Sequence, residues 1–210
     1  TTDNIQNTNR GSNGGQTTIS GASNPHKLRD SAQTMKLSPM MQEYCKTKEE
    51  YKDCILFYRL GDFYEMFFDD ALLVSKTLEL TLTGKECGLE ERAPMCGVPH
   101  HSSEIYVKKL IEAGYKVAIC EQLTDPSEGK GIVQRDVIRV VTPGTLIESS
   151  MLSDDNNNYI CCAYYDNQSC GMCFADISTG EVRLALVDGG KNLEPELVDL
   201  LSRYSPAEVI

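Results

Sequence analysis

The stretch CILFYRLGDFYEMF, residues 54–67, decides the fold. It opens with an apolar run, 54–60, that is rich in strand-forming side chains and is stopped by Gly61 and Asp62, so we predict a buried strand there. Glu65 follows Asp62 at the spacing of a capping box, and apolar residues then recur with a period near 3.6, which predicts a helix over 63–79. The residues that carry this period are Met66, Phe67, Ala71, Val74 and Leu78.

Helix and strand signals alternate on both sides of this stretch. Ser38 can cap a helix that has Pro39 in its first position, and Ser102 or Ser103 can cap another that stops at Gly114. The order that we predict for this region is α-β-α-β-α-β-β. Its helices cover about 39–53, 63–79 and 103–114, its strands 54–60, 80–83, 116–122 and 133–141, and its loops 84–92, 93–101 and 124–131.

From residue 159 the pattern changes to a meander of short strands. We predict strands at 159–165, 171–177 and 181–187, an amphipathic helix at about 193–203 and a last strand at 207–210. The predicted fold class is therefore α/β, with a mixed β-sheet and flanking helices over 36–150 and the start of a truncated second α/β domain over 151–210. Residues 1–35 contain few large apolar side chains, so we expect a disordered or non-native leader there.

The composition is that of a globular chain with 40% hydrophobic and 24% charged residues. The sequence contains no apolar run near the length of a membrane span and no secretory signal pattern, so we expect a cytoplasmic protein without a membrane partner. Nine scattered cysteines favour reduced thiols over a disulfide framework. The net charge of −11 argues against strong binding to nucleic acid phosphates by this chain alone.

Four motifs follow one another at spacings that resemble the N-terminal region of bacterial MutS-type DNA mismatch-repair proteins. They are FYRLGDFYEMF (57–67), PMCGVPHH (94–101), AICEQ (118–122) and RVVTPGT (139–145). The resemblance covers about 36–210. It implies a mismatch-recognition domain over 36–150 and the start of a connector domain with a ribonuclease-H-like fold over 151–210.

The resemblance also implies the roles of two residues. Phe63 would wedge into the minor groove and stack on a mispaired base, and Glu65 would hydrogen-bond to that base. A mismatched step is already poorly stacked, so the insertion of a ring costs less there than in paired DNA. A glutamate is tolerated only where it takes up a proton or meets a base donor, so it penalises matched DNA. Lys85, Arg135 and Arg139 are weaker candidates for phosphate contacts, with solvated surface charges as the alternative.

The partners that the resemblance implies are mismatched or looped double-stranded DNA, a second copy of the protein in a homodimer, and a MutL-type repair partner. ATP and magnesium would bind in a C-terminal domain that is missing here. The chain contains no Gly-x-x-x-x-Gly-Lys-Ser/Thr motif, so we expect it to be no enzyme and to hold no cofactor or metal of its own.

Each candidate residue has a structural alternative. Local sequence alone favours Phe63 as a core residue of the predicted helix and Glu65 as the third residue of a capping box. His100, His101 and Cys96 make a poor metal-ligand set, because adjacent side chains on a regular element point in different directions.

Two other groups of side chains suggest different functional classes. Carboxylates in the strand meander could bind metal in a nuclease, although turn formation is a simpler explanation; they are Asp166, Asp176 and Glu181. Four cysteines could form a zinc or redox site, although buried thiols are favoured; they are Cys161, Cys162, Cys170 and Cys173.

Overall fold

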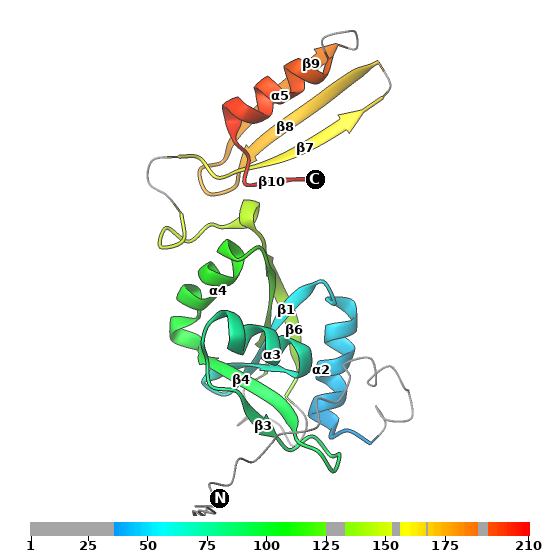
Figure 1. The fold of residues 1–210 in the computed structure, drawn as a ribbon, viewed down its shortest axis with the longest axis vertical. Helices are drawn as coiled ribbons and strands as arrows, with labels where there is room; N and C mark the ends of the chain where they lie inside the picture. Colours follow the sequence, from blue (N-terminus) through cyan, green and yellow to red (C-terminus); the bar gives the residue numbers. More distant parts are fainter. Residues whose placement is uncertain (1–35, 125–132, 153–155, 167, 189–192) are drawn as a thin grey trace, which may run out of the picture.

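The computed structural model describes residues 36–124, 133–152, 156–166, 168–188 and 193–210. Its strands form one sheet of six strands and one of four, which lie at opposite ends of the molecule (Figure 1). The predicted leader, 1–35, lies outside the described residues, as does nearly all of the predicted loop at 124–131.

The six-stranded sheet and its helices are built from the first two thirds of the chain. In order, the elements are α2 (Pro39–Glu50), β1 (Cys54–Leu60), β2 (Phe63–Phe67), α3 (Phe68–Thr77), β3 (Thr83–Lys85), β4 (Ala93–Pro99), η2 (His100–Ser102), α4 (Ser103–Glu112), β5 (Lys116–Gln122), β6 (Arg135–Val141) and η3 (Pro143–Thr145).

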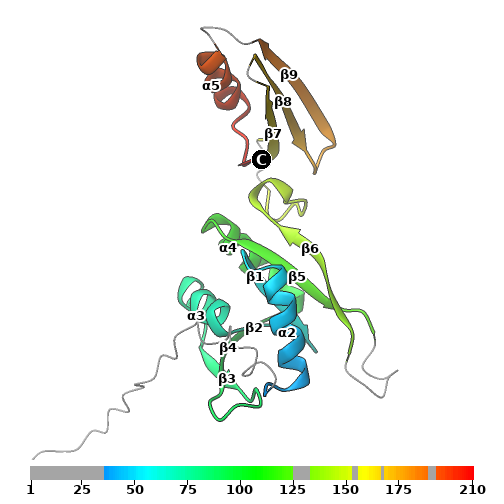
Figure 2. The same cartoon turned by 90° about the vertical axis from the view of Figure 1, so that its right-hand side faces the viewer.

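This sheet is mixed, as predicted. The strand order is β3-β4-β2-β1-β5-β6, with β1 and β5 parallel and every other neighbouring pair antiparallel. Helix α2 packs on one face through Met41 and Tyr44, whereas α3 and α4 cover the other face (Figure 2). The sheet is therefore buried between two layers of helix.

The predicted helix over 63–79 is wrong in its first turn. Residues 63–67 form β2, which pairs with β1 in a hairpin whose register joins Leu60 to Phe63, and helix α3 begins only at Phe68. Gly61 and Asp62 are a two-residue hairpin loop, and Gly61 has the positive φ of 60° that such turns need. The helical period at 71, 74 and 78 is real, but alternating burial governs 63–67.

The predicted connection at 93–101 is also wrong, because 93–99 form β4, an inner strand between β3 and β2. Its prolines stand near the two ends of the strand, at 94 and 99, so they interrupt the ladder little. The strand predicted at 80–83 lies later, at 83–85. Helix α2 ends at Glu50 rather than near Asp53, and Ser38 makes no side-chain capping bond. The helix and strands predicted at 103–114, 54–60, 116–122 and 133–141 are confirmed to within two residues.

Asp70 at the start of α3 joins three elements of the first domain, α3, β1 and α2. Its carboxylate accepts the backbone N–H of Leu56 in β1 at 2.9 Å and pairs with the Lys48 ammonium of α2 at 2.9 Å. The pairing of β2 with β1 begins only at Tyr58, so the Leu56 N–H needs this side-chain acceptor. Burial raises the pKa of Asp70, and the Lys48 charge opposes that effect.

The four-stranded sheet is formed by the last part of the described chain. Its elements are β7 (Tyr159–Tyr165), β8 (Ser169–Asp176), β9 (Glu181–Asp188), α5 (Leu193–Tyr204) and β10 (Glu208–Val209), in the sheet order β10-β7-β8-β9. Helix α5 packs on one face, where Tyr204 stacks on Phe174 with ring centroids 4.4 Å apart. The meander and the helix predicted from the sequence are confirmed, as is the α/β fold class.

Gly144 in η3, the turn that follows β6, contacts the four-stranded sheet. Its N–H donates to the Glu208 carboxylate at 3.2 Å, and the Asn158 amide donates to the Pro143 carbonyl at 2.9 Å. A Cβ at position 144 would lie 2.9 Å from the Ile160 Cβ and 3.0 Å from the Glu208 Cβ. The joint therefore has no room for a side chain.

Candidate functional site

The tip of the β1–β2 hairpin presents Phe63 to solvent. Its side chain is 47% exposed, although it is a large aromatic residue in the first position of a strand. The alternative interpretation of Phe63 as a core residue is therefore wrong. Because side chains alternate along a strand, Phe63 and Glu65 share the α2 face of the sheet, whereas Tyr64 and Met66 pack into the core on the opposite face.

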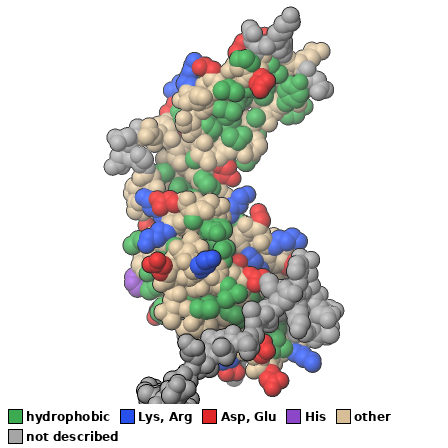
Figure 3. Space-filling view, in the orientation of Figure 1, with side chains coloured by type: hydrophobic (Ala, Val, Ile, Leu, Met, Phe, Trp, Pro, Cys, Tyr) green, Lys and Arg blue, Asp and Glu red, His purple; other side chains and the backbone are tan. Residues whose placement is uncertain are grey.

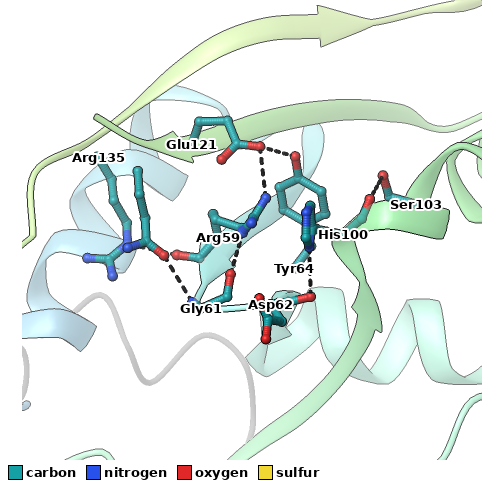
Figure 4. A network of polar contacts seen from close by, with 9 residues as sticks. Arg59, Gly61, Asp62, Tyr64, His100, Ser103, Glu121 and Arg135 are labelled. Carbon is teal, nitrogen blue, oxygen red and sulfur yellow. Dashed lines mark hydrogen bonds and ion pairs between the residues drawn. The ribbon is translucent and has the colours of Figure 1, made fainter. Parts of the chain in front are cut away.

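The backbone of the tip is fixed by hydrogen bonds to residues outside the hairpin loop. The Gly61 N–H donates to the Gln122 side-chain oxygen at 2.9 Å, and the Arg59 Nε donates to the Gly61 carbonyl at 2.5 Å. On the other side, the Asp62 carbonyl accepts the His100 N–H at 2.9 Å (Figure 4). Both residues of the loop are thereby tied to the sheet, so Phe63 stands on a rigid support.

A second set of contacts lies behind the tip. The Tyr64 hydroxyl donates to the Glu121 carboxylate, which also pairs with the Arg59 guanidinium at 3.4 Å (Figure 4). The same guanidinium lies 5.6 Å from the centroid of the Tyr64 ring. Burial and the neighbouring Glu121 both raise the Tyr64 pKa, so the phenol stays a hydrogen-bond donor.

Glu65 lies one strand position beyond Tyr64 and does not cap a helix, so the capping-box interpretation is wrong. Its carboxylate pairs with the Lys85 ammonium, with the Nζ 2.5 Å from Oε2. Directly opposite Glu65 on β4 is Gly97, where a Cβ would lie 3.5 Å from the Glu65 Cγ. The absence of a side chain at 97 leaves a path for Glu65 across β4 toward β3.

The three weaker candidates for phosphate contact all have partners within the protein. Lys85 pairs with Glu65. Arg135 donates to the Arg59 carbonyl at 2.8 Å and lies over the Tyr58 ring, close to the hairpin. Arg139 is tied to Glu148 and to the Thr145 carbonyl, near η3. The structure thus places Lys85 against Glu65 on β2 and Arg135 against the neighbouring strand β1, and it places Arg139 apart from both.

Surface charge gives little support for tight phosphate binding by this chain. On the face shown in Figure 3, basic and acidic side chains are interspersed over the lower part of the molecule rather than gathered into a basic stripe. Together with the net charge of −11, this distribution predicts weak non-specific attraction to a duplex.

The carboxylates of the second sheet are used by their own turns. Asp176 is 2% exposed and accepts four hydrogen bonds, from the backbone N–H groups of Asn158, Ser178 and Thr179 and from the Ser178 hydroxyl. Burial works to raise its pKa, but these hydrogen bonds outweigh burial and hold the pKa below its usual value. Asp166 accepts the N–H groups of Gln168 and Ser169 in the preceding turn. The turn interpretation therefore explains both aspartates.

Glu181 is also satisfied by local partners, since it accepts bonds from Asn157, Tyr159 and Arg183. Among the residues that the structure describes, no group of three or more potential ligands is placed to hold a metal ion. His100 and His101 likewise form no such group. The His100 ring faces the Asp62 carbonyl, and the two imidazole rings stand edge to face.

The Cys-x-x-Cys pair cannot act as a chelating unit, because three positions along a strand separate opposite faces of the sheet. Cys170 is buried and Cys173 is half-buried on the other side of β8. Cys161 is buried as predicted, whereas Cys162 is exposed, contrary to the buried-thiol prediction. In the described parts of the chain every cysteine is a free thiol.

Sequence reasoning missed the residues that hold the tip: Arg59, Glu121, Gln122 and His100. A signal was present, since Glu121 and Gln122 are polar residues at the end of an apolar strand, β5. Their meeting with the tip depends on β5 pairing parallel to β1, which the local pattern does not specify. The Lys85–Glu65 contact depends in the same way on β4 lying between β2 and β3.

None of the helices in the described residues combines the length and apolar composition that a membrane crossing requires.

Comparison with known sequences gives two family matches. Residues 38–150 match the family model described as MutS domain I, and residues 158–210 match the one described as MutS domain II. The first match alone covers more than half of the chain.

Individual relatives agree with these matches. The chain is 56% identical over 176 residues to the DNA mismatch repair protein MutS of Clostridium beijerinckii, an alignment that covers 84% of this chain and 19% of the relative. It is 58% identical over 177 residues to the protein of that name from Clostridium botulinum strain Eklund 17B, covering 84% and 18%. For Lachnoclostridium phytofermentans the identity is 54% over 174 residues, covering 83% and 18%. The chain spans about a fifth of the length of these curated relatives.

Proposed function

Because this chain belongs to the MutS family, we propose that its β1–β2 hairpin reads mispaired or looped double-stranded DNA from the minor groove. Phe63 inserts into the weakened base step and stacks on the mispaired base, and Glu65 accepts a hydrogen bond from that base. The observation that carries this proposal is the 47% exposure of the Phe63 ring at the tip of a hairpin whose backbone is held on both sides.

Rigid support matters because an intercalating side chain must transmit force to the base stack. Unstacking a base step costs a few kcal/mol. A mismatched step has already lost part of that stacking, so the same insertion costs less there, and the difference becomes discrimination. The bonds from Gln122, Arg59 and His100 keep the loop from yielding when the ring meets a fully stacked step.

Most of the affinity for DNA must come from parts of the protein other than this acidic chain. A duplex attracts proteins through lysine and arginine contacts with phosphates, and here acidic residues outnumber basic ones. The hairpin therefore supplies selectivity, and the remainder of the longer cytoplasmic protein supplies most of the phosphate contacts. ATP and magnesium binding, homodimer formation and a MutL-type partner belong to that longer protein in this proposal. The chain itself is assigned no catalytic residue.

The test is equilibrium binding of the full-length gene product to matched, mismatched and single-nucleotide-loop duplexes at one stated salt concentration. We expect a preference for the mismatched and looped duplexes. Phe63→Ala should lower affinity for these two by about ten-fold or more, since each base stacked on an aromatic ring contributes about 1–3 kcal/mol. Affinity for the matched duplex should change little.

Leu72→Ala is the matched control, because Leu72 is 46% exposed but lies on α3, on the opposite side of the sheet. It should bind as the wild type does. Undiminished preference for mismatched DNA in the Phe63→Ala variant would refute the wedge.

A further inference from the structure

We propose that Lys85 sets the selectivity of this site by holding the Glu65 carboxylate until a mispaired base displaces it. This inference rests on the proposed function. It gives Lys85 a role different from the phosphate contact suggested by its charge: Lys85 acts through Glu65 and is a positioning residue.

The geometry shows how one lysine reaches this carboxylate from two strands away. Glu65 is opposite Gly97, whereas Lys85 is opposite Ala93, four residues along the intervening strand β4. The Lys85 side chain spans this offset, and its ammonium lies 2.5 Å from the Glu65 carboxylate and 5.7 Å from the centroid of the buried Phe67 ring. The Phe67 ring and the open position at Gly97 thus guide the pairing.

This ion pair can exchange partners. The Lys85 side chain is 32% exposed and the Glu65 side chain 16%, so water and a ligand can reach both. Lys85 lies at the end of β3, a strand of three residues at the edge of the sheet. Within the described residues, side-chain hydrogen bonds to Glu65 come from Lys85 alone. A base donor at the tip therefore competes with one ammonium, not with a network.

The competition has opposite consequences for the two kinds of duplex. When Lys85 is paired with Glu65, the negative charge beside the DNA is largely cancelled and matched DNA is repelled less. When a mispaired base engages Glu65, it must first displace the ammonium. Removal of the Lys85 ammonium should therefore lower the affinity for matched DNA and raise the affinity for mismatched DNA. Any direct attraction between Lys85 and phosphate would disappear equally from both duplexes and would leave the ratio of the two affinities unchanged.

The measurement is the ratio of mismatched to matched affinity in the full-length gene product. Lys85→Gln is expected to raise this ratio by about five-fold, the size expected when one ion pair of modest exposure is removed. Lys85→Arg keeps the cation and should retain the wild-type ratio. Lys52→Gln removes the same charge from an exposed pair with Glu49 and should also leave the ratio unchanged.

A double-variant cycle with Glu65→Gln tests whether Lys85 acts through Glu65. In the Glu65→Gln background, Lys85→Gln should change the ratio by less than about two-fold, because there is no carboxylate to release. An equal change in both backgrounds would overturn the proposal, as would an unchanged ratio in the single variant or a Lys85→Arg variant that behaves like Lys85→Gln.

The same titrations distinguish failure of the proposed function from failure of the Lys85 role. If the wild type shows no preference for mismatched DNA, or keeps it without Phe63, the proposed function fails. If Phe63→Ala removes the preference but the Lys85 and Glu65 effects are independent, only the role of Lys85 fails. Thermal unfolding of each variant confirms that the strands remain folded, since a structural loss would lower both affinities together.

Discussion

Glu65 on the first sheet and Asp176 on the second are both carboxylates on strands, but their partners are of different kinds. Asp176 is enclosed and accepts three backbone N–H groups and a hydroxyl. Glu65 is half-buried and meets one lysine side chain. A backbone N–H cannot leave without unfolding its turn, whereas a lysine side chain can rotate away.

This difference separates carboxylates that stabilise the fold from one whose partner a ligand can replace. It also explains why the nuclease interpretation of the second sheet loses its support. Asp166 and Asp176 have the residue type of a metal site, but one carboxylate oxygen of each accepts hydrogen bonds from the turn that follows it. The kind of donor around a carboxylate is therefore more informative than its presence in the sequence.

The largest effect should follow from Asp176→Ala. The change leaves the N–H groups of Asn158, Ser178 and Thr179 without their acceptor, at a cost of about 3 kcal/mol in the free energy of unfolding. Hydrogen exchange should show the loss in β7 and β8 and not in the first sheet. Asp188→Ala, at the exposed end of β9, is the control. Equal losses in the two variants would remove the contrast between the sheets.

A smaller effect is expected from Gly61→Ala at the hairpin tip. Gly61 has a φ of 60°, which costs an L-residue about 1–2 kcal/mol, although no atom lies within 4 Å of the added Cβ. The strain should lower thermal stability and also weaken mismatch selectivity, because the loop backbone supports Phe63. Gly171→Ala has the same open space without positive φ and should be nearly neutral. A neutral Gly61→Ala would show that the tip is not held in this conformation.

Glu65→Gln should change the free energy of unfolding by less than about 1 kcal/mol, because the pair with Lys85 is partly exposed. Its effect should appear in the ratio of mismatched to matched affinity instead. Chemical denaturation compared with Asp176→Ala provides the measurement. A loss of stability as large as that of Asp176→Ala would place Glu65 among the structural carboxylates.

The smallest expected effect is the change of folding stability at acidic pH. The pKa of Asp176 is lowered, so its contribution to stability is complete above the unfolded value of about 3.8 and is lost as pH falls through the folded pKa. The pKa of Asp70 is raised, so protonation of Asp70 stabilises the fold as pH falls from its raised pKa to below 3.8.

Unfolding temperatures of Asp70→Asn and Asp176→Asn, each compared with the wild type as pH is lowered, measure the two trends. As pH falls, the unfolding temperature of Asp176→Asn should approach that of the wild type. The unfolding temperature of the wild type should instead rise relative to that of Asp70→Asn. Trends of the same sign would contradict the opposite pKa shifts.

Much of the fold was predictable because burial patterns are local. Strands β5 and β7 have their predicted bounds, and the helical period that begins at Ala71 was identified correctly. The error at 63–67 arose because Asp62 and Glu65 match a capping box, while Gly61-Asp62 equally matches a hairpin turn. Two local signals competed, and pairing with β1 and β4 decided between them.

The sequence pointed to two candidate residues of the site, but not to the residues that support them. Phe63 and Glu65 were identified through a motif. Gln122 and Lys85 reach the hairpin only through the order of strands in the sheet, which local sequence does not encode. Contacts between residues 20 or 61 positions apart depend on topology.

Substitution of the glycine at position 144 offers a way to test whether the arrangement of the two sheets affects the hairpin. A single methyl group there would lie 2.9 Å from the Ile160 Cβ on β7 and 3.0 Å from the Glu208 Cβ on β10, so these strands would have to shift away from η3. Alanine, serine and valine at this position therefore form a graded set of spacers, remote from the hairpin, with which the angle between the sheets can be altered in small steps.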